Sequence, residues 1–132
     1  GSIALWVSKK AGYVLGIDEN LSSIKDARAA ASYNRAKHLA FKQGDVEKEL
    51  ITLSRNDYNC VIFDPPRAGL TERLINSLNG SAVKRIIYVS CNPVTLKRDI
   101  LLLKKRFSPV SIQAIDMFPH TEHIECVALL EA

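Results

Sequence analysis

The stretch RIIYVSCNPV, residues 85–94, says most about the fold of this 132-residue chain. It begins with an apolar run, 85–90, of the kind found in buried strands. Asn92 is a natural helix cap, and Pro93 suits the first turn of a helix, where its missing N–H does no harm. Residues 94–105 continue as a helix. The stretch therefore predicts a buried strand that leads directly into a helix.

Similar strand-like runs lie on both sides of this stretch. Each is short and apolar, and helix-like segments separate the runs, as residues 21–36 do with apolar side chains at helical spacing. The further runs cover residues 13–18, 39–45, 58–63, 110–115 and 124–130. Continuous apolar strands separated by helices predict an α/β fold with a mostly parallel sheet covered on both faces.

Four successive strand ends carry a residue able to do chemistry. They are Asp18, Asp45, Asp64 and Cys91. In open parallel sheets ligands bind beyond the carboxyl ends of the strands, so we expect a site there. An acid in the place of Asp18 commonly receives the two ribose hydroxyls of an adenosine cofactor, and Asp45 is suited to an adenine amino group. A plain helix-capping or turn role is the alternative for both acids.

The strand that should come first in such a sheet is missing from the sequence. Residues 2–10 look like a helix, whereas a dinucleotide-type fold has a strand and a glycine-rich turn immediately before this helix. Gly1-Ser2 is either the remnant of that turn, which we favour, or a cloning scar. We therefore expect residues 1–132 to be one N-terminally truncated domain without its first strand.

Composition indicates a globular chain, with 47% hydrophobic and 24% charged residues. No apolar run approaches the roughly 18 residues that span a membrane, and residues 1–6 lack the layout of a signal peptide. A cytoplasmic protein is expected. The net charge of +4 favours a polyanionic partner only mildly. Three cysteines, none in a Cys-x-x-Cys pair, argue against a disulfide framework or a zinc ribbon.

Cys91 stands out among the three cysteines because it lies just before an expected helix. The partial positive charge of a helix N-terminus favours a thiolate, which is the nucleophilic form. The alternative is a buried cysteine that acts as a small hydrophobic residue, and this interpretation fits Cys60 and Cys126 inside their apolar runs.

Asp64-Pro65-Pro66-Arg67 forms a rigid corner, since two prolines fix the backbone. Such a corner can hold Asp64 beside a planar base, or it can simply stop a strand. A similar acid-Pro-Pro-aromatic turn occurs in amino-group methyltransferases, but Arg67 stands here where the aromatic residue would stack on the base. Lys97 and Arg98 either hold phosphates or form a solvated helix face.

Residues 118–126 concentrate titratable groups in an apolar neighbourhood. His120, His123 and Cys126 are types that bind zinc, but residues three apart in an extended segment point to opposite faces, so no metal is expected. Glu125 leads into a strand and is a candidate general base; a solvated carboxylate is the alternative.

Three motifs, taken in order, resemble the RNA 5-methyluridine (uracil-C5) methyltransferases. They are DPPRAG at 64–69, VSCNPVTLKRD at 89–99 and DMFPHTEHIE at 116–125. The resemblance covers nearly the whole chain from Val14 onward. It implies a Rossmann-like class I methyltransferase fold, S-adenosylmethionine as the methyl donor, and a uridine in tRNA or rRNA as the substrate.

The resemblance also implies roles for individual residues. Cys91 matches the nucleophile that adds to C6 of uracil, Glu125 matches the base, and Arg67 is a candidate RNA contact. The positions implied around the cofactor are Ser2, Asp18, Asp45 and Asp64. The strand missing from this fold would be central, between the strands ending at Asp18 and Asp64. The chain is then expected to leave a gap there or to pair with another copy, and to be inactive alone.

Two other functions are kept open. One is an amino-group methyltransferase of nucleic acid, which would share the Asp64-Pro65-Pro66 corner but would not need Cys91. The other is a non-catalytic RNA-binding fragment, whose affinity would depend steeply on salt and not at all on Cys91 or Glu125.

Overall fold

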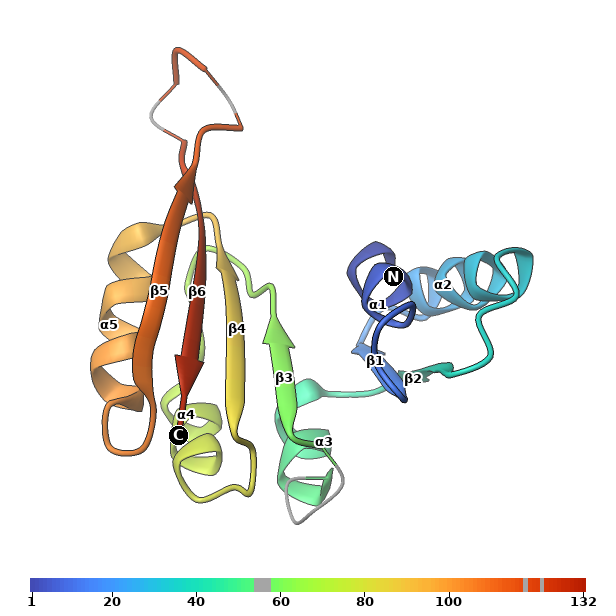
Figure 1. Ribbon diagram of the computed structural model, residues 1–132, viewed down its shortest axis with the longest axis horizontal. Helices are drawn as coiled ribbons and strands as arrows, with labels where there is room; N and C mark the ends of the chain where they lie inside the picture. The colour runs from blue at the N-terminus through green and yellow to red at the C-terminus, as the bar shows by residue number, and fades with distance from the viewer. Residues whose placement is uncertain (54–57, 118, 122) are drawn as a thin grey trace. The chain divides into compact units, whose positions relative to one another are not determined.

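The computed structural model describes residues 1–53, 58–117, 119–121 and 123–132. In Figure 1 the helices and strands carry the labels used below. The chain forms two compact units, Gly1–Glu49 and Leu50–Ala132. None of the helices in the described residues has the length and apolar character needed to span a bilayer.

The first unit is built on two parallel strands. β1 (Val14–Asp18) pairs with β2 (Leu39–Gln43), in a register that sets Asp18 opposite Gln43. The unit also holds α1 (Ser2–Val7), α2 (Leu21–Tyr33) and the first residues of α3 (Val46–Leu53). Both expected strands and the helix between them are present, but β2 ends at Gln43, two residues before Asp45, and α2 ends at Tyr33.

Helix α2 covers this pair of strands. Its start is fixed by the side chain of Asn20, which accepts hydrogen bonds from the amides of Ser22 (2.8 Å) and Ser23 (3.2 Å). One face of α2, made by Ile24, Ala27 and Ala31, is buried. The Phe41 ring of β2 lies so close to β1 that a Cβ on Gly16 would be 2.5 Å from the ring.

The second unit is a four-stranded sheet in the order β3-β4-β6-β5. β3 (Cys60–Phe63) and β4 (Arg85–Ser90) are parallel, whereas β6 (Glu125–Glu131) runs antiparallel to both β4 and β5 (Ser108–Ile115). The apolar runs at 110–115 and 124–130 are therefore strands, as expected, but they form an antiparallel hairpin whose second strand inserts beside β4.

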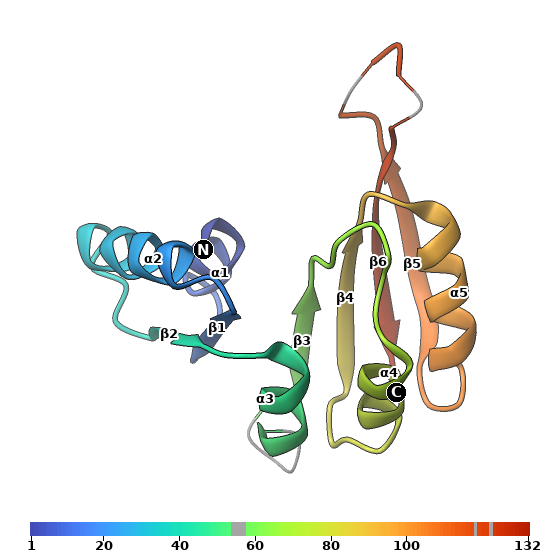
Figure 2. The same ribbon diagram turned by 180° about the vertical axis from the view of Figure 1, so that it is seen from behind.

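Two helices cover one face of this sheet. They are α4 (Glu72–Asn79) and α5 (Pro93–Leu103), and Figure 2 shows both on the same side of the strands. Alternate residues of β4 and β6 point beneath them and are buried, including Ile86, Tyr88 and Leu130. This layer is the main core of the unit.

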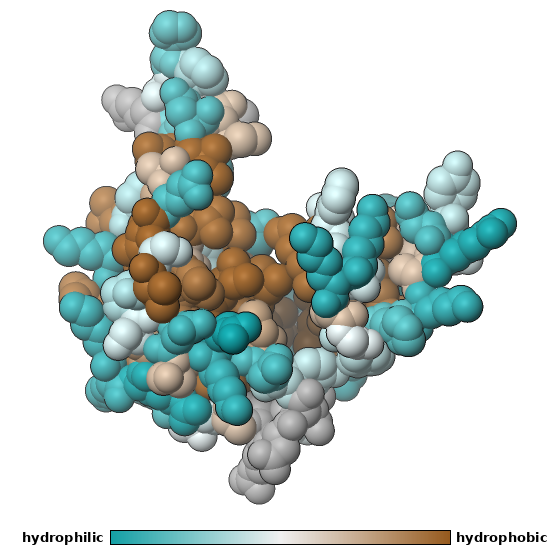
Figure 3. Space-filling model, in the orientation of Figure 1, coloured by the Kyte–Doolittle hydropathy of each residue, from teal (hydrophilic) through white to brown (hydrophobic). Residues whose placement is uncertain are grey.

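The opposite face of the sheet is apolar and only half-buried. Register places Ile87 opposite Leu129 and Val89 opposite Val127 on this face. Figure 3 shows hydrophobic side chains gathered over these strands. In the described part of the chain, β1 pairs only with β2, and β3 only with β4. The described strands thus form two separate sheets, with β1 and β3 each paired on one side only.

Candidate functional site

The predicted site residues fall into two groups, one in each unit. Ser2, Asp18 and Asp45 belong to the first unit. Asp64, Arg67, Cys91 and Glu125 belong to the second.

Asp18 ends β1, and Asp45 lies two residues beyond the end of β2, at the same end of the strand pair. The amide of Gly44 donates to the carbonyl of Asp18 (3.1 Å), which ties the two strand ends together. Asp18 is exposed, and its Oδ1 accepts a hydrogen bond from the amide of Asn20 (2.8 Å). Ser2 is the exposed first residue of α1, a helix that contacts β1.

Asp45 is already engaged at the start of α3. Its Oδ1 accepts from the amides of Glu47 (2.9 Å) and Lys48 (3.3 Å), and its Oδ2 lies 3.5 Å from Lys48 Nζ. Burial by itself raises the pKa of Asp45, but these amide hydrogen bonds and the Lys48 charge outweigh it, so the pKa is lowered. The capping alternative therefore has direct geometric support at this position.

Cys91 lies where the sequence predicts it, between β4 and α5, and is half-buried. Asn92 caps the helix, accepting from the amide of Val94 (3.1 Å). The Ser90 hydroxyl accepts from the Asn92 amide (3.1 Å) and lies 3.0 Å from the Asn92 carbonyl, a geometry that closes a tight turn around Cys91. The turn fixes the backbone of Cys91 at the positive end of α5.

Glu125 is the first residue of β6 and is half-buried. The antiparallel register of β4 and β6 ends with Ser90 opposite Cys126. Cys91 directly follows Ser90 and Glu125 directly precedes Cys126, so both residues lie at the same end of this strand pair.

The other two cysteines differ from Cys91. Cys126 is buried and Cys60 half-buried within strands. Burial raises the pKa of both thiols; the Glu125 charge adds to this for Cys126, whereas the Arg85 charge opposes it for Cys60. Both therefore fit the expected small apolar role.

Asp64 and Arg67 follow β3 and are exposed. Because β3 and β4 are parallel, with Phe63 opposite Tyr88, Asp64 lies at the sheet end where β4 leads to Cys91. Side chains of α5 and its cap hold this corner. Asn92 Nδ2 donates to the Arg67 carbonyl (3.2 Å).

Arg98 and Lys97 are both exposed on α5, in keeping with the solvated-face alternative. Arg98 also bonds within the chain: its Nη2 lies 2.7 Å from Asp99 Oδ1 and donates to the carbonyl of Ala68 (2.9 Å). Asp99 was missed by sequence reasoning, although it falls on the apolar face of α5 between Leu96 and Leu103, a place where a charge is unusual.

Among the described residues, no three His, Cys, Asp or Glu side chains converge in a way that could hold a metal ion. His120 lies in a turn with a positive φ of 68°. Phe118 and Glu122 of the third motif lie outside the described residues.

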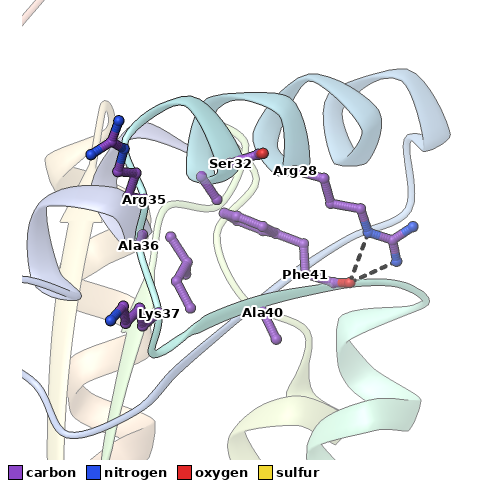
Figure 4. A pocket seen from close by; sticks show the side chains of 9 residues that line it. Arg28, Ser32, Arg35, Ala36, Lys37, Ala40 and Phe41 are labelled. Atoms are coloured by element: carbon purple, nitrogen blue, oxygen red, sulfur yellow. Dashed lines mark hydrogen bonds between the residues drawn. The ribbon is translucent and has the colours of Figure 1, made fainter.

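The first unit also has a cavity of about 650 Å³, which lies between the end of α2 and β2 and is separate from the candidate site residues. Figure 4 shows Arg28, Arg35 and Lys37 around it, with Arg28 bonded to the carbonyl of Phe41. Its lining includes no residue proposed from the sequence.

A sequence model of the family described as tRNA (Uracil-5-)-methyltransferase matches residues 19–132. An uncharacterised RNA methyltransferase of Caldanaerobacter subterraneus is 41% identical over 134 residues, which cover 99% of this chain and 30% of that protein. One of Bacteroides thetaiotaomicron is 40% identical, with the same coverages. The chain thus spans about a third of the length of these relatives.

Two solved structures are similar to this chain, one in sequence and fold and the other in fold alone. The tRNA (uracil-54, C5)-methyltransferase of Pyrococcus abyssi, in complex with S-adenosyl-L-homocysteine, superposes with a TM-score of 0.86 at 38% identity, covering 98% of this chain and 31% of that one. A dimethyladenosine transferase of Plasmodium falciparum reaches 0.71 at 15% identity, covering 99% of this chain and 52% of that one, a likeness of fold alone.

Proposed function

The chain belongs to the tRNA (uracil-5-)-methyltransferase family, and on this premise we propose that the complete protein transfers a methyl group from S-adenosylmethionine to C5 of a uridine in RNA. Cys91 is the nucleophile and Glu125 the base. The observation that supports the proposal is that β4 leads to Cys91 at the start of α5, while its antiparallel neighbour β6 begins with Glu125 at the same end of the sheet.

The chemistry explains why a thiol and a carboxylate are needed together. Uracil C5 is a poor nucleophile until the Cys91 thiolate adds to C6, which moves the ring electrons onto O4 and makes C5 electron-rich. S-adenosylmethionine supplies the methyl group that C5 then takes. Glu125 removes the C5 proton, the double bond re-forms, and the bond between Cys91 sulfur and C6 breaks. Once Glu125 passes this proton to solvent and S-adenosylhomocysteine, the demethylated donor, leaves, the thiolate and the carboxylate are both restored.

The residues at the strand ends suit the methyl donor. The exposed carboxylate of Asp18 at the end of β1 fits a ribose diol. We assign the cofactor site to Ser2, Asp18, Asp45 and Asp64. Since Asp45 already caps α3, less of its carboxylate is left to accept from the cofactor.

The RNA partner binds at the end of the second unit's sheet where Asp64 and Arg67 follow β3. Arg67 is exposed beside Asp64 and is suited to a backbone phosphate. The target uridine must leave its stack to reach Cys91. A tRNA is the first substrate to test, because the Pyrococcus abyssi enzyme is described as acting on tRNA, and an rRNA is the second. A cytoplasmic location is compatible with either.

The test uses the complete protein with RNA that carries 5-fluorouridine at candidate positions. Fluorine at C5 blocks proton removal, so intact-mass spectrometry should detect a protein–RNA adduct that includes the transferred methyl group. The adduct should disappear in Cys91→Ala and persist in Cys60→Ala, the matched control. With ordinary uridine, Glu125→Gln should accumulate the same methylated adduct.

Two results would contradict the proposal. Methylation that survives Cys91→Ala, without any adduct, would point to amino-group chemistry at the Asp64 corner. RNA binding that depends steeply on salt, with no methyl transfer by the complete protein, would indicate a binding function alone.

A further inference from the structure

A carboxylate lies in the core of the second unit, where nothing in the methyl-transfer chemistry requires it. Asp99 of α5 has no solvent exposure. Its Oδ2 accepts hydrogen bonds from the Tyr88 hydroxyl (2.6 Å) and from the amide of Leu70 (2.8 Å). Its Oδ1 lies 2.8 Å from Nε and 2.7 Å from Nη2 of Arg98. Burial and the bond to Asp99 together raise the pKa of Tyr88, so the hydroxyl stays a donor.

Arg98 extends this network to the segment Arg67–Leu70. Its Nη2 donates to the carbonyls of Ala68 (2.9 Å) and Leu70 (3.2 Å) while it pairs with Asp99. The planar guanidinium can serve a carboxylate and neighbouring carbonyls at once because its donors are fixed in one fork. The segment is therefore held through both its amide and its carbonyl groups.

Gly69 shows how closely the Arg67–Leu70 segment packs against Arg98 and Asp99. Its φ is +79°, in the left-handed region. A Cβ at this position would lie 2.5 Å from Asp99 Oδ2 and 2.8 Å from Arg98 Nη2. A side chain would meet the buried Asp99 carboxylate and the Arg98 guanidinium bonded to it, so glycine is required for both conformation and space.

The same helix holds the segment at its other end. Asn92 Nδ2 donates to the Arg67 carbonyl (3.2 Å), and Thr95 Oγ1 lies 3.1 Å from the same oxygen. Since Asn92 directly follows Cys91, the corner that carries Asp64 and Arg67 and the turn that carries the thiol share one support.

Building on the function proposed above, we propose that Asp99 and Arg98 are positioning residues, which lock the Arg67–Leu70 segment to α5 and thereby fix Asp64 and Arg67 relative to Cys91. The two prolines at 65 and 66 make the connection to Asp64 stiff. A buried carboxylate is satisfied only when all its donors are in place, so it selects one arrangement of the segment where apolar packing would tolerate several. Small displacements of positioned groups slow catalysis strongly.

The test compares variants of the complete protein. Asp99→Asn removes the charge, Arg98→Lys keeps the charge but loses the fork, and Tyr88→Phe removes one donor with the least disturbance. Arg85→Lys is the matched control, because Arg85 forms an exposed ion pair with Glu131 at the other end of β4. For each variant, kcat and KM for RNA and cofactor, the thermal midpoint, and hydrogen exchange of the Leu70 amide are measured.

We expect Asp99→Asn and Arg98→Lys to lower kcat by about 10- to 100-fold well below their melting temperatures, with KM changed far less. Exchange at Leu70 should accelerate in both variants and not in Arg85→Lys. Tyr88→Phe should show the same pattern more weakly, and it serves if Asp99→Asn does not fold. The rate of adduct formation with 5-fluorouridine RNA should fall in parallel with kcat.

Variants that melt earlier and exchange faster at Leu70 while kcat is unchanged would show that the network serves stability alone. Unchanged exchange at Leu70 would show that Asp99 does not hold the segment. Either result overturns the proposal. A wild-type protein that methylates no uridine would instead refute the function proposed above, and the exchange measurement would still report on the network.

Discussion

Gly69 combines a positive φ of 79° with close neighbours on α5, Asp99 and Arg98. Replacing it with alanine forces a Cβ into the left-handed region and against the Asp99 carboxylate, 2.5 Å away. We expect Gly69→Ala to lower the free energy of unfolding by about 2–4 kcal/mol, from backbone strain and overpacking together.

Urea unfolding of the complete protein measures this change. Gly80→Ala is the matched control, since Gly80 also lies in the second unit but a Cβ there would be 3.7 Å from its nearest neighbour, an ordinary contact. Equal losses in the two variants would mean that the Arg67–Leu70 segment can move aside.

Residues of the site differ in how visible they are in the sequence. Cys91 and Glu125 stand out because each is a chemically active residue in a motif, and the pairing of β4 with β6 brings them to the same end of the sheet. Arg98 and Asp99 lie in the same motif as Cys91, but their role depends on a loop some thirty positions away in the chain that meets α5 only in the folded state. Local patterns cannot reveal such long-range partners.

At the scale of elements, the cap of α5 should have a function beyond stability. Asn92, which directly follows Cys91, accepts a hydrogen bond from the Val94 amide and donates one to the Arg67 carbonyl. Thr71 caps α4 in the same way, accepting from the Leu74 amide (3.1 Å), but α4 carries no predicted site residue. Replacing either cap with alanine should cost about 1 kcal/mol of unfolding free energy.

Only Asn92→Ala should also slow adduct formation with 5-fluorouridine RNA, because only this cap fixes the turn around Cys91. Stopped reactions analysed by denaturing electrophoresis give the rate for both variants. If Thr71→Ala slowed the reaction equally, stability rather than the position of Cys91 would be limiting.

Strand positions follow well from the sequence, whereas helix limits and strand directions follow less well. The strand expected at 85–90 matches β4, because a continuous apolar run is a strong signal. Helix α2 ends at Tyr33, three residues early, where Arg35 turns to a φ of 53°. Helices α3 and α4 have no counterpart among the expected ranges, since eight residues show little period. An apolar run also carries no direction, so the antiparallel place of β6 could not be foreseen.

At the scale of the whole molecule, the described residues form two sheets rather than one. β1 and β3 each pair along one edge only, and such an edge presents unpaired N–H and C=O groups to another chain. The chain covers 30% of its relative from Caldanaerobacter subterraneus, which is 41% identical. The unpaired edges predict self-association of the isolated 132 residues.

We expect sedimentation velocity to show concentration-dependent assembly of the isolated chain. Ile62→Lys should reduce the assembly, because a charge on the edge strand β3 opposes pairing with a second copy. Gln113→Lys is the matched control: Gln113 pairs with Val127, on the same uncovered face as Ile62, but it lies on β5 at the other edge of the sheet. Equal effects of the two lysines would assign the assembly to the apolar face of the sheet instead. A strictly monomeric wild-type chain would show that the edge of β3 is not adhesive, and the expected pairing with another copy would then be wrong.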